Sequence, residues 1–290
     1  MIVSTLTPAV KAQVLVEALP YIKRFWGKVV VVKYGGNVLT GADESTALRS
    51  FAEDVVLMRS VGMRPVVVHG GGPQIGEMLQ RLNIASEFRR GLRVTDAATL
   101  EVVRMVLVGK VNREIVSAIN MHGPLAVGMS GEDANLLRVT CRDPELGFVG
   151  DVDHVNTDVL NRLLTDELIP VIATIGVDGT GQAYNVNADT AAGSIAGALN
   201  AEKLVYLTNI EGLRRDVDDP LTHISSTTVA ELQSMMADGT LSGGMIPKIE
   251  SCLTAIRCGV DKAHILDGRS PHALLLEVFT NAGIGTEVTA

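Results

Sequence analysis

The chain has 290 residues, 47% of them hydrophobic, and a formal net charge of -8 at pH 7. This acidity argues against nucleic-acid binding, which needs a basic surface, and no apolar run approaches the roughly 18 residues that span a bilayer. The three cysteines match neither a disulfide framework nor a CxxC metal site. We therefore expect a cytoplasmic protein that binds small molecules and neither nucleic acid nor membranes.

Residues 1–26 precede the first predicted strand and are expected to form a helical arm. Its apolar side chains recur at helical spacing, at Val10, Val14, Leu15, Ala18, Leu19, Ile22 and either Phe25 or Trp26. Pro20 is expected to kink this helix rather than to break it. Two placements stay open: the arm packs back on its own chain, or it pairs with another subunit.

Short apolar runs alternate with amphipathic segments along the rest of the chain. The runs are VVVVKYGG, RPVVVHGGG, PLAVGMSGED, LIPVIATIGVDG, KLVYLTNIEG and KAHILDG. The amphipathic segments 44–61, 95–119 and 227–237 suit crossover helices, so the order predicts an α/β fold with a mainly parallel sheet. The final runs HALLLEVFT and GTEVTA predict an antiparallel edge. The string DGTGQ at 178–182 is expected to separate two lobes.

Two glycine-rich turns follow buried strands. Lys33 lies at the carboxyl end of the first strand, one residue before the two glycines of KYGG. Gly71 and Gly72 follow the second strand, and Pro73 marks the start of a helix. Backbone N–H groups at such turns favour anions, although the strings match neither a Walker A loop nor GxGxxG. A tight structural turn is the alternative at each position.

Five further residues carry charged or amide groups at positions that suit ligand binding. Arg93 can hold a carboxylate through two parallel hydrogen bonds, although most arginines are solvated surface residues. Asn187 and Asp189 open an alanine-rich helix, and capping alone would explain both of them but not Asn185. Lys248 opens another helix, where a cation opposes the dipole and indicates a bound anion.

Together these residues are typical of phosphoryl transfer, in which positioning and charge stabilisation do most of the catalysis. No Ser/His/Asp or Cys/His set is evident. A carboxylate acceptor fits this inventory, because its pKa of about 4.3 leaves it ionised at pH 7 without a general base. His69, next to the second glycine turn, either bonds a neighbouring backbone group or acts directly, and both interpretations stay open.

The strings KYGGN, VVVHGGGPQI, GLRVT, GEDA, NVNAD and GMIPKIE, in this order, closely resemble the N-acetylglutamate kinases of the amino acid kinase family. The resemblance runs from about Lys28 to the C-terminus. It implies an open, mainly parallel αβα sandwich, in which residues 27–180 bind the amino acid and residues 181–290 bind ATP. The implied reaction phosphorylates the γ-carboxylate of N-acetyl-L-glutamate, the second step of arginine biosynthesis. ATP would carry its own Mg²⁺, with no dedicated metal site on the protein.

The resemblance also assigns roles to individual residues. Lys33 and Lys248 would stabilise the transferring phosphoryl group, and Asp189 would hold both ammonium groups in place. The implied substrate-binding residues are Gly71, Gly72, Arg93 and Asn185, and the implied nucleotide-binding residues are Gly36, Thr208 and Asn209. The string TNIEGLRR departs from the family, with Asn209 where aspartate is usual and Arg214 where an apolar or aromatic residue is common. Nucleotide affinity or metal dependence is therefore expected to differ from that of relatives.

Arginine-inhibited members of the family carry an N-terminal helix that interlaces dimers into a hexamer. The resemblance therefore implies a homo-oligomer, a hexamer built as a trimer of dimers, with feedback inhibition by L-arginine. The implied arginine site comprises Lys203, His264, Glu277 and Gly285, with Glu277 as partner for the guanidinium.

Two other functions stay open. One is a different amino acid kinase, such as glutamate 5-kinase, aspartokinase or carbamate kinase. The other is a non-catalytic arginine-sensing member of the same fold. The presence of Lys33, Asp189 and Lys248 together argues against the second.

Overall fold

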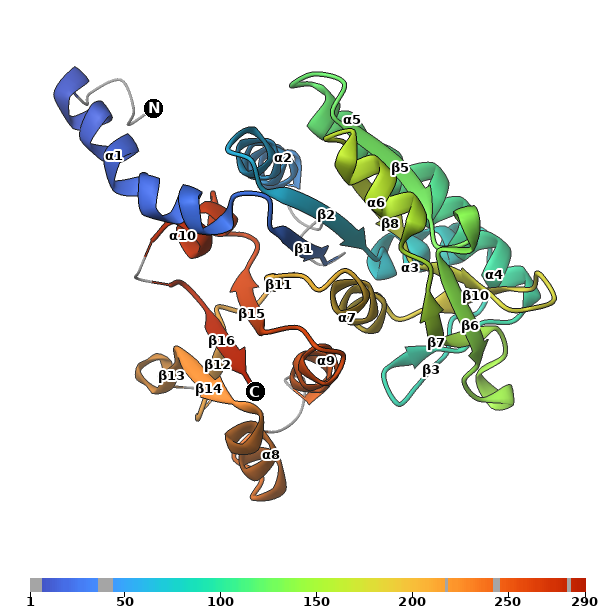
Figure 1. Ribbon diagram of the computed structural model, residues 1–290. Coiled ribbons are helices and arrows are strands. Elements are labelled where there is room, and N and C mark those ends of the chain that lie inside the picture. Colours follow the sequence, from blue (N-terminus) through green and yellow to red (C-terminus); the bar gives the residue numbers. More distant parts are fainter. Residues whose placement is uncertain (1–6, 36–43, 217–218, 242–245, 281–282) are drawn as a thin grey trace.

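The computed structural model describes residues 7–35, 44–216, 219–241, 246–280 and 283–290. At its centre lies an eight-stranded sheet (Figure 1), in the order β14-β16-β15-β11-β1-β2-β8-β5. The bounds are Ser226–Thr228, Thr286–Thr289, Lys262–Asp267, Lys203–Thr208, Val29–Tyr34, Arg64–His69, Ile169–Ala173 and Ala126–Ser130, in that order. Paired strands run parallel, apart from the antiparallel pair β15 and β16. The predicted α/β fold with a mainly parallel sheet is confirmed.

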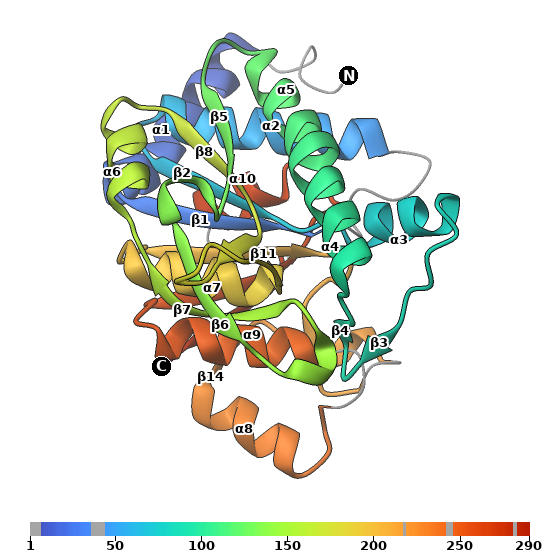
Figure 2. The ribbon, with the colours of Figure 1, turned by 90° about the vertical axis from the view of Figure 1, so that its right-hand side faces the viewer.

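The four valines of β1 explain how the sheet is covered. Val30 and Val32 face one core and Val31 faces the other, because successive residues of a strand point to opposite faces. Helices bury apolar side chains on both faces, which is why the strand reads as a continuous apolar run. Figure 2 shows α2 and α5 on one side of the sheet and α7 and α9 on the other.

The helices divide between these two faces. Those on the face of Val30 are α2 (Glu44–Ser60), α3 (Gly72–Arg81), α4 (Ala97–Arg104), α5 (Asn112–Asn120) and α10 (Ala273–Phe279). Those on the face of Val31 are α6 (Asp158–Thr165), α7 (Ala188–Ala198), α8 (Val229–Ala237) and α9 (Ile246–Arg257). The layers are those of an αβα sandwich.

Helices α4 and α5 continue one another through a wider π-helical stretch, Met105–Val111. The predicted single helix over 95–119 is therefore confirmed in position, but it contains a change of helical type that apolar periodicity does not signal. Such π-helical segments are frequent at functional sites.

A four-stranded barrel was not predicted from the sequence. It consists of β6 (Leu137–Cys141), β7 (Val149–Val155), β9 (Ile175–Val177) and β10 (Ala183–Val186). In β7 the apolar Val152 and Val155 are interspersed with charged residues, so no strong apolar run marks the strand. Short hairpins pair β3 (Phe88–Arg89) with β4 (Leu92–Arg93) and β12 (Leu213–Arg214) with β13 (His223–Ile224).

The prediction that HALLLEVFT forms a strand is wrong. The segment forms helix α10, in which Leu274 and Val278 are buried one turn apart while Leu276 is 40% exposed. A run of consecutive apolar residues does not by itself separate a short helix from a strand. The GTEVTA segment does supply an antiparallel strand, β16, beside β15.

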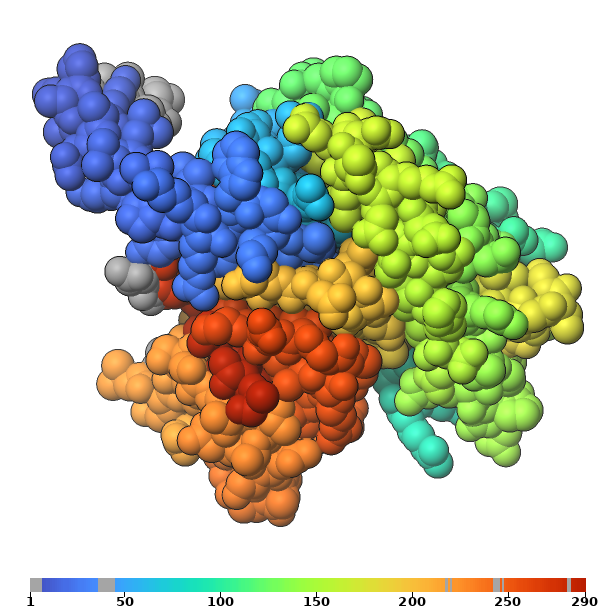
Figure 3. Space-filling model, in the orientation of Figure 1, coloured from blue at the N-terminus to red at the C-terminus, as the bar shows by residue number. Residues whose placement is uncertain are grey.

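The predicted arm is helix α1 (Pro8–Phe25), capped at its N-terminus by the Thr7 side chain. It projects from the body, and Figure 1 shows it bending part-way along. Phe25 is 1% exposed, whereas Leu15 is 70% and Trp26 67% exposed. Figure 3 shows most of the arm standing clear of the body. The described chain therefore leaves most of the apolar stripe uncovered. Among the described residues no helix is both long and apolar enough to cross a bilayer.

Candidate active site

A cavity of about 380 Å³ opens at the carboxyl ends of β1, β2, β8 and β11. In open α/β sheets ligands bind at this edge, where glycine turns and helix N-termini converge. The cavity brings together nine of the predicted site residues, namely Lys33, Gly71, Gly72, Arg93, Asn185, Asp189, Thr208, Asn209 and Lys248. Gly36, which was also predicted, lies outside the described residues.

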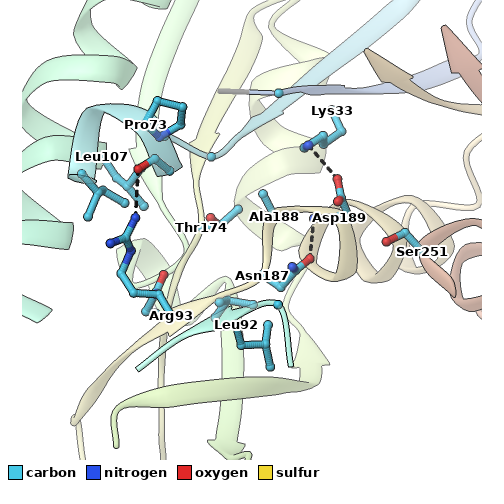
Figure 4. Close-up of a pocket in the computed structure, with 18 of the residues that line it drawn as sticks. Lys33, Pro73, Leu92, Arg93, Leu107, Thr174, Asn187, Ala188, Asp189 and Ser251 are labelled. Carbon is cyan, nitrogen blue, oxygen red and sulfur yellow. Dashed lines mark hydrogen bonds and ion pairs between the residues drawn. The ribbon is translucent and has the colours of Figure 1, made fainter. Parts of the chain in front are cut away.

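An ion pair forms the floor of the cavity. The Nζ atom of Lys33, at the end of β1, lies 2.7 Å from the Asp189 carboxylate in the first turn of α7 (Figure 4). Both side chains are mostly buried. Lys248 enters from the first turn of α9. Burial lowers the pKa of the Lys248 ammonium, the Asp189 charge acts to raise it, and the Lys33 charge lowers it further. The Asp189 carboxylate therefore pairs with Lys33, and its charge also acts on Lys248.

The start of α7 is built as the sequence predicted. The Asn187 side chain caps the helix by accepting hydrogen bonds from the backbone N–H groups of Asp189 and Thr190. Because Asn187 satisfies these groups, the Asp189 carboxylate can turn toward Lys33. Asn185, which capping left without a role, lines the cavity and donates to the Thr95 hydroxyl at 3.3 Å.

At the second glycine turn, Gly71 packs too closely against its neighbours to carry a side chain. A Cβ atom on Gly71 would lie 2.8 Å from Leu107 and 3.1 Å from Val111, whereas a Cβ on Gly72 would meet open space. Gly71 immediately precedes helix α3 and has no side-chain cap, and Pro73 lies in the first turn. The turn therefore presents backbone N–H groups at a helix N-terminus, as an anion site requires.

Arg93 is not the solvated arginine that the alternative interpretation expected. It is 8% exposed and donates to the Gly72 carbonyl at 2.9 Å and to the Ser86 hydroxyl. Its guanidinium lies 4.6 Å from the Phe88 ring centre, and burial lowers its pKa. No carboxylate of the described chain pairs with it. In Figure 4, Arg93 and the Lys33–Asp189 pair lie on opposite sides of the cavity.

His69 bonds to backbone rather than entering the cavity. It is fully buried, and its Nδ1 lies 3.0 Å from the Gly70 carbonyl oxygen. Its Nε2 accepts from the Asn112 amide at 3.0 Å, so Nδ1 carries the proton. Burial lowers the pKa of His69 to about 4. No sequence motif marked Asn112, which directly follows the π-helical stretch.

The nucleotide-binding predictions fall at the end of β11. The Thr208 hydroxyl accepts from the Ile210 N–H at 3.2 Å and donates to the Leu266 carbonyl at 3.3 Å. Asn209 is exposed at the cavity rim. Arg214, the second departure from the family pattern, pairs with Glu211.

The four residues predicted to bind arginine also come together, away from the cavity. Glu277 accepts from Lys203 at 3.4 Å and lies 2.8 Å from His264 Nδ1. Gly285 packs against the Ile265 carbonyl with no room for a Cβ. The Lys203 ammonium lies 5.5 Å from the ring centre of Phe25, the last residue of α1. The arm therefore ends beside this cluster.

Residues 28–267 match the family model described as the amino acid kinase family. The chain belongs to this family. It is 54% identical over 287 residues to an acetylglutamate kinase of Symbiobacterium thermophilum, covering 96% of this chain and 97% of that relative. A Syntrophobacter fumaroxidans acetylglutamate kinase is 53% identical, with 96% of both chains covered.

Solved structures of other proteins share this fold. The N-acetylglutamate synthase of Neisseria gonorrhoeae, in complex with coenzyme A and N-acetyl-glutamate, has a TM-score of 0.83 and 28% identity. The match covers 96% of this chain and 63% of the synthase, so the chain spans less than two thirds of that protein. A carbamate kinase from Giardia lamblia, at 16% identity and a TM-score of 0.70 over 91% of this chain and 98% of its own, shows the fold alone.

Proposed function

We propose that the protein transfers the γ-phosphoryl group of ATP to the γ-carboxylate of N-acetyl-L-glutamate, the second step of arginine biosynthesis. The observation that carries this proposal is one cavity holding two lysines, a shared carboxylate and, opposite them, a buried arginine without a carboxylate partner among the described residues. The acetylglutamate kinases at 52–54% identity support the choice of acceptor.

The acceptor is held by the part of the cavity around Arg93. The guanidinium binds the α-carboxylate, and the Asn185 amide lies beside it. The γ-carboxylate lies against the N–H groups of Gly71 and Gly72, where the positive end of α3 favours an anion. No side chain has to remove a proton, because the acceptor carboxylate is already ionised at pH 7.

Phosphoryl transfer takes place on the other side of the cavity, at Lys33, Asp189 and Lys248. An oxygen of the γ-carboxylate attacks the γ-phosphorus, the bond from that phosphorus to the bridging oxygen breaks, and ADP leaves with the electron pair. Lys33 and Lys248 stabilise the charge on the equatorial oxygens during transfer. Asp189 keeps the two ammonium groups from separating, since like charges at this distance repel.

The nucleotide lies toward Thr208 and Asn209, with Gly36 offering an N–H group. In this proposal residues 27–180 form the amino-acid lobe and residues 181–290 the ATP lobe. Mg²⁺ bound to the ATP phosphates neutralises part of their charge. We place it there because Asp189, the one carboxylate among the described cavity residues, pairs with Lys33, and no described cluster of His, Cys, Asp or Glu suits a metal ion.

We further propose that L-arginine inhibits the enzyme at Lys203, His264, Glu277 and Gly285. Burial acts to raise the pKa of Glu277, but the His264 hydrogen bond and the Lys203 charge lower it overall, so the side chain is an anion able to bind a guanidinium. A related N-acetylglutamate synthase structure contains L-arginine.

We also propose that the protein is a cytoplasmic hexamer, assembled as a trimer of dimers. The exposed apolar side chains of α1 support assembly, because contact with another subunit would cover them.

The acceptor assay separates the proposed function from its alternatives. ADP release and hydroxylamine-trapped acyl phosphate are measured with N-acetylglutamate, glutamate, aspartate and carbamate, each with MgATP. A Lys33→Ala variant purified in parallel reports any contaminating kinase. Turnover confined to N-acetylglutamate supports the proposal. Faster turnover of another acceptor would make the protein a different amino acid kinase, and arginine binding without turnover would make it a sensor.

A further inference from the structure

Tyr206 joins the two helices that carry the charged residues of the cavity. It is 2% exposed, on strand β11, in register with Lys33 on the neighbouring strand β1. Its hydroxyl oxygen lies 3.3 Å from the carbonyl oxygen of Asp189 and 3.1 Å from that of Ser251, so the two carbonyls share its single proton. Asp189 lies in the first turn of α7, and Ser251 lies three residues after Lys248 on α9. One hydroxyl therefore contacts both helices near their cavity ends.

This contact depends on close packing between α7 and α9, which Figure 2 shows side by side. A Cβ on Gly193 would lie 3.4 Å from the Ala255 backbone, and one on Gly197 would collide with the Cys258 carbonyl. Because Gly193 and Gly197 follow Asp189 at four-residue intervals, all three lie on the same face of α7. The hydroxyl of Tyr206 therefore lies at the cavity end of a tightly packed helix seam.

The Tyr206 hydroxyl is suited to hold that end of the seam in place. Full burial raises the pKa of Tyr206 well above its ordinary value, so the hydroxyl keeps its proton and acts as a donor. Carbonyl oxygens have two lone pairs, so those of Asp189 and Ser251 can accept from Tyr206 while keeping their helical bonds. The hydroxyl can therefore hold α7 and α9 together beside the ion pair, and both helices keep their own hydrogen bonds.

We propose that Tyr206 is a positioning residue that sets the placement of Lys248 relative to the Lys33–Asp189 pair. This rests on the proposed function, in which those three residues act during phosphoryl transfer. A shift of α9 against α7 would move the Lys248 ammonium away from the transferring group, while the acceptor subsite around Arg93 would stay in place. The residue therefore affects the rate of transfer more than it affects acceptor binding.

Tyr206→Phe removes the hydroxyl and keeps the ring. We expect kcat to fall about 3- to 10-fold, as for the loss of one buried hydrogen bond, with KM for N-acetylglutamate within twofold of the parent. Tyr184→Phe is the matched control, because Tyr184 donates to Asp178 at 3.4 Å in the barrel, outside the seam. Its kcat should equal that of the parent.

A double-mutant cycle separates positioning from a merely structural role. If Tyr206 acts through Lys248, then Tyr206→Phe should cost no further kcat in a Lys248→Ala background. Hydrogen exchange at the amides of Gly193 and Ala255, one helical turn after Asp189 and Ser251, gives a readout that needs no substrate. Tyr206→Phe should speed this exchange, whereas Tyr184→Phe should not. An unchanged kcat, an equal loss in the Lys248→Ala background, or unchanged exchange would each overturn the proposal. Lack of turnover by the parent would reject the proposed function instead, and exchange would still decide whether Tyr206 fixes the seam.

Discussion

Lys33 and Asp189 form a 2.7 Å ion pair although they come from distant parts of the chain. One residue ends a central strand and the other begins helix α7, so the fold alone brings them together. The pair places a cation in the cavity, and the Asp189 charge also acts to keep the nearby Lys248 ammonium protonated. The chemistry proposed for the cavity depends on this arrangement.

Asp189→Asn keeps the shape of the side chain and removes its charge. We expect kcat to fall about 100-fold or more, on the scale of losing a charged group that organises transition-state contacts. The fold should persist, because Asn187 still caps α7. Steady-state kinetics and circular dichroism together check both statements. Normal turnover in this variant would leave Asp189 with a structural role only.

Arg93→Lys tests the acceptor subsite. A lysine cannot reproduce the planar guanidinium that donates to Gly72 and Ser86 and faces the acceptor. We expect the KM for N-acetylglutamate to rise by about 5- to 150-fold, equivalent to roughly 1–3 kcal/mol, with kcat changed much less. Initial rates over a range of N-acetylglutamate concentrations measure the effect. An unchanged KM would remove Arg93 from the binding site.

His69 should make the protein less stable in mild acid. Burial lowers its pKa from 6.5 to about 4, so between these values the unfolded chain binds the extra proton and the folded chain does not. The contribution of neutral, buried His69 to the free energy of unfolding is therefore fully present above pH 6.5 and is lost as the pH falls toward 4. Asp54, whose pKa burial raises to about 6, acts in the opposite direction.

Comparing variants isolates the His69 contribution. Urea unfolding at pH 7, 6 and 5 should show a smaller loss of stability on acidification for His69→Gln than for the parent. His122→Gln, at an exposed position, should behave like the parent, and Asp54 contributes equally to all three. If the free energy of unfolding changed equally with pH in all three proteins, His69 would bind its proton as readily in the folded chain as in the unfolded chain. That result would contradict the prediction.

Removing residues 1–19 should convert the assembly to active dimers with much weaker arginine inhibition. This truncation keeps Phe25, which is buried beside Lys203, and removes most of the exposed stripe. Leu15→Glu, at a 70% exposed position, should have the same effect on assembly in the full chain. Sedimentation and inhibition curves check both. A truncated hexamer with unchanged sensitivity would contradict the proposal.

Local sequence chemistry predicted much of the fold and site. The β1 valines predicted a strand covered on both faces, and the NVNAD string predicted the cap of α7, because strand burial and helix capping depend on neighbouring residues. The charged residues of the cavity could also be predicted. Glycine turns and helix starts mark the edge of the sheet, and the charged residues near them meet there.

Features that depend on distant contacts could not be predicted. The segment around Leu274 is a helix in which residues one turn apart, Leu274 and Val278, face the core, and a short apolar run does not encode that choice. The buried state of Arg93 and the hydroxyl bonds of Tyr206 arise from packing between remote elements. The π-helical stretch that precedes Asn112 likewise leaves no mark in apolar periodicity.

The kinetics of Lys248→Ala test the proposed chemistry most directly. The charge that this lysine meets develops during transfer, so kcat should fall by about 100-fold or more while the KM for N-acetylglutamate changes little. Lys28→Ala, at an exposed ion pair with Glu202, is the matched control and should turn over normally. Acyl phosphate trapped as the hydroxamate, with N-acetylglutamate varied at saturating MgATP, gives both constants. A change mainly in KM, with kcat near that of the parent, would contradict a role for Lys248 in phosphoryl transfer.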